Sequence, residues 1–308
     1  MNVVVLMSTY QGEAFVVEQM RSILHQLPPG GRVLVRDDGS TDRTVERIEG
    51  MGDPRISIIR GPNLGFARSF FALLAAAPAD ADVLMLSDQD DVWLSHKIER
   101  ACTQLAGQAQ GPALYCSRVV MVDGTLRPLG HSLPFPRGPS FANALTENIV
   151  TGCTIAINRA ALALVLRHGD PKRIYFHDWW MYLVVSAFGE IIADNEATML
   201  YRQHGANVVG RGAGIRRYLV NLGFMIRKNW VHIMFNQIDN FREVHGAALT
   251  SDKMALLQGT FDARSPRAMA RLLLTPMRYR QTLTDDFLLR FLVVAELLAG
   301  RGLLPRGT

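Results

Sequence analysis

Cysteine is scarce in this chain, and this excludes two kinds of scaffold. The 308 residues include three cysteines, Cys102, Cys116 and Cys153, an odd number without a closely spaced pair. Disulfide frameworks and structural zinc sites use cysteines in pairs, so the sequence favours neither, and a reducing cytosol fits it best. Cys153 has no neighbouring base that would activate its thiol, so we assign it to packing.

Long apolar runs are absent as well. No stretch reaches the roughly 18 uninterrupted apolar residues of a membrane-spanning helix, and the longest candidates, 182–192 and 291–298, contain Glu190 and Glu296. The N-terminus opens directly on the apolar segment 2–7 without a basic stretch before it, so we expect no signal peptide. These absences predict a cytoplasmic protein that does not span a membrane.

Acidic residues are few in the last third of the chain. Residues 211–308 contain 15 Lys or Arg against 7 Asp or Glu, whereas residues 1–210 contain 18 against 21. We therefore predict a globular domain over 1–210 and a basic helical region over 211–308. Basic stretches with aromatic residues, such as 225–230, suit an anionic membrane surface, and a helical appendage with solvated arginines explains them equally well. No zinc-finger or helix-turn-helix pattern is present, which argues against nucleic-acid binding.

Apolar runs alternate with helical periods in the first half, which is typical of an α/β sheet of mostly parallel strands. The predicted strands cover 3–7, 32–36, 56–59 and 83–86. The predicted helices between them cover 15–27, 41–49 and 67–77. Further on, irregular segments rich in proline predict a mixed edge of the sheet, followed by an apolar run at 149–157 interrupted by Gly152 and a helix at about 179–188.

Polar residues follow each predicted strand. Ligands of open α/β sheets bind outside the carboxyl ends of the strands, so these residues should share one crevice. They are Ser8, Thr9, Tyr10, Asp37, Asp38, Asn63, Asp88 and Asp90.

Three carboxylates, Asp88, Asp90 and Asp91, lie within four residues at the end of the fourth strand. Carboxylates this close repel one another unless a cation lies among them. Mg²⁺ and Mn²⁺ take one or two such ligands together with substrate phosphates, so the cluster predicts a metal site for a phosphate-bearing substrate. A solvated turn or a helix cap is the alternative.

Four motifs in this order resemble those of glycosyltransferase family 2, whose members are inverting enzymes of the GT-A fold. They are 7–13, 36–42, 88–91 and 177–180, and the resemblance covers about residues 1–205. Segments 87–93, 177–180 and 201–205 are most similar to a bacterial rhamnosyltransferase branch. The resemblance implies a Rossmann-like sheet flanked by helices with a helical C-terminal appendage, Mg²⁺ or Mn²⁺ as cofactor, and a dTDP- or UDP-sugar as donor.

The resemblance also implies how the donor is held. Tyr10 would stack on the base, and Asp38 would accept a hydrogen bond from an imide N–H of uracil or thymine; a turn with a helix cap is the alternative for 37–40. Asp90 matches the second acid of the family's Asp-X-Asp motif and is the implied metal ligand, while Asp91 would support it or cap a helix. His204 would complete the metal site or contact the diphosphate, or it lies on the surface. The implied donor-binding residues are Ser8, Thr9, Tyr10, Glu13, Asp38, Arg68 and Asp88, where Arg68 is as well explained as an exposed helix arginine.

On the acceptor side, Asp178 matches the family's catalytic base. Inversion needs one base that removes the proton of the acceptor hydroxyl, and a helix cap is the alternative role. Trp179 and Trp180 would line the acceptor pocket or belong to the core. Gly152 would permit a close approach of substrate or form a strand bulge.

The leading hypothesis is transfer of L-rhamnose from dTDP-L-rhamnose to a glycan or lipid-linked glycan acceptor of the bacterial surface, such as a lipopolysaccharide core, an O-antigen or another cell-wall polysaccharide. Peripheral contact with the cytoplasmic face of the inner membrane would bring enzyme and acceptor together. A sugar-phosphate nucleotidyltransferase is one alternative, although the loop 8–13 has one glycine and no basic residue. A catalytically silent glycan-binding or scaffold protein of the same fold is the other.

Overall fold

The computed structural model describes residues 1–107, 111–168, 171–203, 229–299 and Leu303. The chain divides into two compact units. The first comprises Met1–Phe135, Ile149–Leu166 and Phe176–Gly205, and the second comprises Pro136–Asn148, Arg167–Tyr175 and Ala206–Thr308. Both units are therefore discontinuous in sequence, because two short segments from the middle of the chain belong to the second unit.

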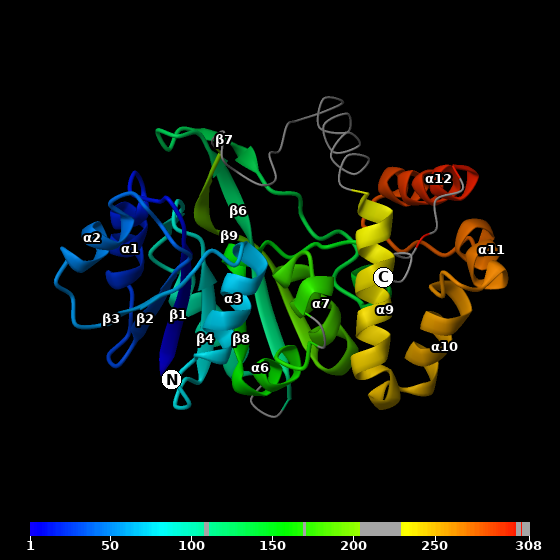
Figure 1. Cartoon of the computed structure of the whole chain (residues 1–308), viewed down its shortest axis with the longest axis horizontal. Coiled ribbons are helices and arrows are strands. Elements are labelled where there is room, and N and C mark those ends of the chain that lie inside the picture. Colours follow the sequence, from blue (N-terminus) through cyan, green and yellow to red (C-terminus); the bar gives the residue numbers. More distant parts are fainter. Residues whose placement is uncertain (108–110, 169–170, 204–228, 300–302, 304–308) are drawn as a thin grey trace. The chain divides into compact units, whose positions relative to one another are not determined.

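The first unit is built on one mixed sheet, in which the described strands follow the order β3-β2-β1-β4-β8-β6-β9-β5, with β7 paired to β6 (Figure 1). The first four strands are parallel, and β8 is antiparallel to both of its neighbours. The predicted α/β class and the mixed edge are thus confirmed. The strands are β1 (Val3–Thr9), β2 (Arg32–Asp37), β3 (Ile56–Arg60), β4 (Val83–Ser87), β5 (Val92–Trp93), β6 (Ala113–Val122), β7 (Pro128–His131), β8 (Ala156–Asn158) and β9 (Glu190–Arg202).

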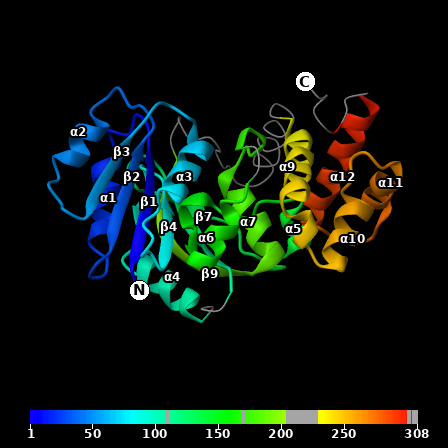
Figure 2. The ribbon, with the colours of Figure 1, turned by 60° about the horizontal axis from the view of Figure 1, so that its bottom comes forward.

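Helices cover both faces of this sheet. One face packs against α1 (Val16–Leu24), α2 (Thr44–Glu49) and α4 (Lys97–Ala106), which share a core with alternate residues of β1. The other face carries α3 (Phe66–Ala75), α6 (Arg159–Val165) and α7 (His177–Phe188), which lie beside one another (Figure 2). Because β1 is covered on both faces, its residues 3–7 are all fully buried, as expected of a central parallel strand.

Two elements differ from the expectation. Helix α2 begins at Thr44 rather than at residue 41, because the backbone N–H groups of Thr41 and Asp42 donate to the side chain of Gln11 and so are held in a turn. The apolar run at 149–157 is a short 3₁₀ helix, η1 (Gly152–Thr154), followed by β8. Gly152 therefore begins a turn of helix, and the alternative of a strand bulge is wrong.

The second unit is helical in its described part. It contains α5 (Phe141–Ala144), the 3₁₀ turns η2 (Pro171–Arg173) and η3 (Gly246–Ala248), α9 (Trp230–His245), α10 (Ser251–Thr260), α11 (Pro266–Leu274) and α12 (Leu283–Leu298). Asp239 of α9 accepts hydrogen bonds from Arg173, Arg242 and Arg264, which ties three segments together. Among the described helices, none combines the length and the apolar character that crossing a bilayer requires.

Candidate active site

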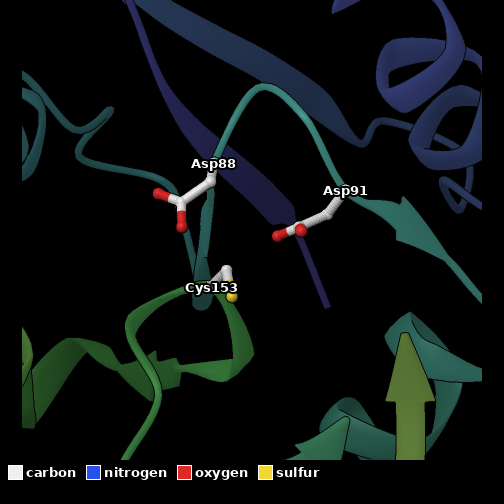
Figure 3. A group of neighbouring side chains, drawn as sticks. All are labelled: Asp88, Asp91 and Cys153. Atoms are coloured by element: carbon white, nitrogen blue, oxygen red, sulfur yellow. The ribbon is translucent and has the colours of Figure 1, made fainter. Parts of the chain in front are cut away.

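The side chains of Asp88, Asp91 and Cys153 lie close together at the carboxyl end of β4, with the Asp91 carboxyl group directed toward Asp88 (Figure 3). One ligand atom of each residue lies within 4.8 Å of those of the other two. The two acids flank the turn between β4 and β5, and Cys153 comes from η1. This places the acidic cluster where the sequence predicts it, outside the carboxyl end of a central strand.

Burial and mutual repulsion control the protonation of this cluster. Burial, with the charges of Asp90 and Asp178, raises the pKa of Asp88 to about 7. Burial, with the charges of Asp90 and Asp88, raises the pKa of Asp91 well above its usual range. Oδ2 of Asp91 is buried without a hydrogen-bond partner in the described part of the chain. Such a group is unfavourable unless something positive faces it.

The Cys153 thiol supports the carboxylates instead of competing with them. Burial, followed by the charges of Asp91 and Asp88, raises the pKa of the thiol, which therefore keeps its proton beside the two acids. A protonated thiol is a poor ligand for a hard cation. Cys153 therefore packs beside the two acids as a buried, neutral thiol.

Arg202, at the end of β9, holds the acidic turn in place. Its Nε donates to the backbone oxygen of Asp90 at 2.8 Å, and its backbone N–H donates to Oδ1 of Asp91 at 3.1 Å. Its guanidinium also pairs with Glu18 of α1 and stacks over Phe15 at 4.6 Å. Because this buried side chain joins three elements, the turn is fixed before any ligand binds.

Gln19 of α1 braces the same turn from the core. In the orientation of its amide that pairs every donor with an acceptor, it donates to the backbone oxygen of Asp91 at 2.8 Å and accepts from Ser87 and Trp93. Gln19 has no exposed surface. A buried polar side chain with all its hydrogen bonds satisfied restricts the turn to one conformation.

Gln89 connects the acidic turn to the loop after β1. Its amide oxygen accepts from the backbone N–H of Tyr10, and its amide nitrogen donates to the backbone oxygen of Tyr10, both at 2.8 Å. Gly12 permits this contact, since a Cβ there would lie 2.1 Å from Oε1 of Gln89. Tyr10 is 49% exposed, so its ring can be reached by a ligand that stacks on it.

The other residues expected to bind the donor have partners within the first unit. Ser8 hydrogen-bonds to Ser69 at 2.6 Å, and buried Thr9 donates to Asp37 at 3.1 Å. Glu13 accepts from the backbone N–H of Arg43. Exposed Arg68 donates to the backbone oxygen of Leu64 at 2.7 Å.

The sequence left open whether Asp37 and Asp38 form a turn or bind the donor, and the hydrogen bonds of the two residues differ. Oδ2 of Asp37 accepts from the backbone N–H groups of Gly39 and Ser40, so Asp37 builds the turn. Asp38 is buried, pairs with Arg36, and accepts from the backbone N–H groups of Leu64 and Gly65 at 2.8 and 2.9 Å. Asp38 therefore organises the loop after β3. A nucleobase that contacts Asp38 would share a carboxylate that already has these partners.

Asp178 lies in the first turn of α7, close enough for its charge to raise the pKa of Asp88. The residue before the helix is Phe176, so Asp178 is not the cap itself. A carboxylate in the first turn is stabilised by the helix dipole. Gly152 lies against this helix start, since a Cβ there would be 2.9 Å from Nε2 of His177 and 3.5 Å from Cβ of Asp178.

His177 is buried beside Asp178 and stacks on Phe70 with a ring separation of 4.2 Å. Burial lowers its pKa to about 3, so the imidazole is neutral. Neither ring nitrogen has a hydrogen-bond partner among the described residues. His177 therefore serves as an aromatic support for the start of α7.

Trp179 and Trp180 are in the core. They are 2% and 0% exposed, and the indole N–H of Trp180 donates to the backbone oxygen of Val165 at 3.2 Å. The expected acceptor-lining role is therefore not supported, because neither ring presents a surface to an acceptor; the apolar side of α7 needs both for packing. His204 lies outside the described residues.

The sequence pattern that defines glycosyl transferase family 2 matches residues 4–168, which is more than half of the chain. This chain belongs to glycosyl transferase family 2. The dTDP-rhamnosyl transferase RfbG of Shigella flexneri is 27% identical over 248 residues, which are 76% of this chain and 83% of that protein. An uncharacterized glycosyltransferase of Haemophilus influenzae is 26% identical over 214 residues, 65% of each chain.

Solved structures of other glycosyltransferases share the fold of this family 2 protein. Residues 1–349 of S. aureus TarS in complex with UDP-GlcNAc superpose with a TM-score of 0.56 at 14% identity, over 98% of this chain and 93% of that one. The mannosyltransferase PcManGT from Pyrobaculum calidifontis, in complex with GDP-Man and Mn²⁺, gives 0.51 at 17% identity, over 97% and 87%. The fold is thus GT-A, as the resemblance implied.

The carboxylates of this family 2 site fit a divalent cation. Among the described residues, Oδ2 of Asp91 is buried without a hydrogen-bond partner. The pKa values of Asp88 and Asp91 are raised because burial and the neighbouring acids disfavour their ionised forms, which a cation would stabilise. Oxygen ligands suit Mg²⁺ and Mn²⁺, and the backbone is already positioned by Arg202 and Gln19. The sequence did not indicate that Arg202 and Gln19 position the acidic turn, although Arg202 lies in the segment 201–205 that carried the resemblance.

Proposed function

We propose that this glycosyltransferase is an inverting, metal-dependent enzyme that transfers L-rhamnose from dTDP-L-rhamnose to a glycan of the bacterial surface. The observation that carries the proposal is the close pair Asp88 and Asp91 at the carboxyl end of β4, with Asp90 and Asp178 near enough for their charges to raise the pKa of Asp88. The similarity to a dTDP-rhamnosyl transferase supports the donor. A UDP-sugar is the competing donor, since the solved neighbours include a complex with UDP-GlcNAc.

The chain's own residues would hold the donor at both ends. The exposed Tyr10 ring is available to stack on the base, beside the loop that Asp38 organises. Asp90 is the proposed ligand of Mg²⁺ or Mn²⁺, with His204 as a second ligand and Asp88 facing the ribose or sugar. When bound, the cation supplies positive charge that stabilises the departing diphosphate.

Asp178 is the proposed base. It removes the proton of the acceptor hydroxyl as that oxygen bonds to the anomeric carbon, while the bond from this carbon to the nucleoside diphosphate breaks on the opposite face. The proton ends on Asp178, and the electron pair leaves with the diphosphate. One displacement of this kind inverts the anomeric configuration. Asp178 is suited to the role because its place in the first turn of α7 stabilises its charged form before the reaction.

A donor screen tests this function. Melting temperatures are measured with Mn²⁺ and, in turn, dTDP-rhamnose, UDP-GlcNAc and GDP-mannose. The correct donor should stabilise the fold most, by about 2.7 kcal/mol at a concentration near 100 times its Kd. NMR of the product, or of sugar released by slow hydrolysis, then reports the anomeric configuration. Preference for another donor would remove rhamnose from the proposal, and donor binding without turnover in any acceptor mixture would indicate a silent scaffold.

The acceptor and its location are also part of the proposal. A lipopolysaccharide core, an O-antigen or another cell-wall polysaccharide would be presented at the cytoplasmic face of the inner membrane, and a protein there works by peripheral contact. The excess of Lys and Arg in residues 211–308 supports this placement. Nucleic acid is not a proposed partner.

A further inference from the structure

Helix α12 of the second unit has apolar residues on two opposite faces. Leu289, Leu292 and Val293 are buried on one of them. Five more apolar side chains recur at spacings of three and four residues, which places them together on the opposite, exposed face. These are Leu283, Phe287, Phe291, Val294 and Leu298, with exposed fractions from 37% to 84%.

The exposed stripe continues onto the end of α11. The guanidinium of Arg290 donates to the backbone oxygens of Thr275 at 2.7 Å and Met277 at 2.8 Å, which fastens this loop against α12. Leu274 and Met277 are 81% and 48% exposed, so they extend the apolar surface. We call these seven residues the α12 patch. Isolated exposed apolar residues are ordinary, but a contiguous patch indicates an interaction site.

Cations border the α12 patch. Arg267 and Arg271 lie seven and three residues before Leu274, so the three residues share one face of α11, and all are exposed. No acidic side chain falls on the stripe of α12, since Asp285, Asp286 and Glu296 lie at other helical positions. Apolar side chains beside arginines complement an anionic lipid surface, in which acyl chains lie beneath phosphates.

We propose that the α12 patch docks on an anionic phospholipid bilayer. A helix of 16 residues is about 24 Å long, so α12 would lie along the surface with its exposed face below the headgroups. Phe287 and Phe291 would enter the acyl boundary, and Arg267 and Arg271 would pair with phosphates. This inference extends the proposed function, because it names the surface that would bring the enzyme to a membrane-presented acceptor.

Vesicle flotation of the full-length protein tests the proposal. Phosphatidylcholine vesicles are compared with vesicles that also contain phosphatidylglycerol, at low and high salt. The Phe287→Ser/Phe291→Ser variant should lower the partition coefficient by about tenfold or more. Arg267→Gln/Arg271→Gln should remove most of the preference for the anionic vesicles and most of the salt dependence.

Matched controls come from the first unit. Leu129→Ser/Leu133→Ser replaces two apolar residues that are 59% and 48% exposed, and Arg21→Gln/Arg47→Gln replaces two exposed arginines. Both variants should bind vesicles like the parent. If they weaken binding as much as the α12 variants do, or if the parent binds no vesicles, the proposal is wrong.

Two further measurements distinguish lipid docking from self-association and from an effect on catalysis. Sedimentation velocity without lipid should show the same mass for the parent and for Phe287→Ser/Phe291→Ser; a parent dimer that this variant dissociates would identify the α12 patch as a contact between copies. Donor hydrolysis in solution should be unchanged in every α12 variant. If the parent does not hydrolyse the donor, the proposed reaction is wrong. If the parent hydrolyses the donor and does not bind vesicles, only the proposal of lipid docking is wrong.

Discussion

At the scale of single residues, the structure gives the neighbouring acids Asp90 and Asp91 different surroundings. Asp91 faces Asp88 across the turn, and its Oδ1 accepts a backbone hydrogen bond from Arg202, while Asp90 acts on both acids through its charge. From the resemblance, Asp90 is the proposed metal ligand and Asp91 supports it; the proximity of Asp88 and Asp91 makes Asp91 the competing ligand.

We predict that Asp90→Ala abolishes transfer and the Mn²⁺-dependent rise in melting temperature produced by dTDP. Asp91→Asn should keep that rise at saturating Mn²⁺ and reduce metal affinity by about 10- to 100-fold, as expected for a residue that supports the ligands. Calorimetric titration of Mn²⁺ with dTDP present measures the metal affinity of both variants. The reverse order of effects would make Asp91 the ligand.

Asp178→Asn should leave the fold, metal affinity and donor affinity intact and lower the transfer rate by about 10²- to 10⁴-fold. The amide has nearly the same shape and can still accept from the N–H of Trp179, but it cannot take up a proton. Single-turnover rates with saturating donor measure the loss. A rate within tenfold of the parent would require a different base.

His177 should make the protein less stable in mild acid. The unfolded imidazole binds a proton below its ordinary pKa of 6.5, whereas the buried one does so only near pH 3. The unfolded state therefore gains protons first, and the free energy of unfolding falls as the pH drops below 6.5. Between about pH 7.5 and about pH 5 the parent should lose about 2 kcal/mol more than His177→Gln, measured by urea unfolding. Equal losses would show that His177 titrates normally.

At the scale of elements, the site depends on the close approach of η1 to the start of α7. Gly152 makes this approach possible, because a Cβ would lie 2.9 Å from the ring of His177. The acidic turn depends in the same way on β9 and α1, through Arg202 and Glu18. Each functional group is thus positioned by an element distant from it in sequence.

Gly152→Ala should destabilise the first unit by about 1 to 3 kcal/mol and lower the transfer rate, because the added methyl must displace the buried His177 and with it Asp178. Gly124→Ala is the matched control, since a Cβ there meets nothing within 4 Å. Thermal unfolding and initial rates of both variants test the argument. If the two variants have similar melting temperatures and initial rates, η1 can move away from α7 without a loss of stability or activity.

At the scale of the whole molecule, the three cysteines should behave as unpaired thiols. Cys116 and Cys153 are buried, burial raises the pKa of Cys116 to about 12, and burial also raises that of half-buried Cys102. Thiolates are the reactive species, so a colorimetric thiol reagent at mildly alkaline pH should react slowly with native protein and rapidly with three thiols after unfolding. Reductant should not change the melting temperature. Fewer than three thiols in unfolded protein that was prepared without reductant and kept from oxidation would contradict this.

Much of the fold could be predicted from the sequence, because its signals are local. Continuous apolar runs specify buried parallel strands, and the acids that follow β4 lie outside that strand wherever the rest of the chain goes. The family could be recognised for the same reason, since its motifs are short segments in a set order. The start of α2 and the conformation of 149–157 could not be predicted, because distant side chains determine them: Gln11 holds residues 41 and 42 in a turn, and His177 lies against Gly152.

Only the tertiary structure decides which residues act together. Sequence spacing cannot show that Asp91 and Cys153 meet, that Arg202 holds the acidic turn, or that Trp179 and Trp180 are core residues, since these contacts join segments tens of residues apart. The same holds for α12, whose apolar residues on two faces would read from sequence as a buried helix. The packing of one face leaves the other exposed, and this exposure is the basis for assigning it to a lipid surface.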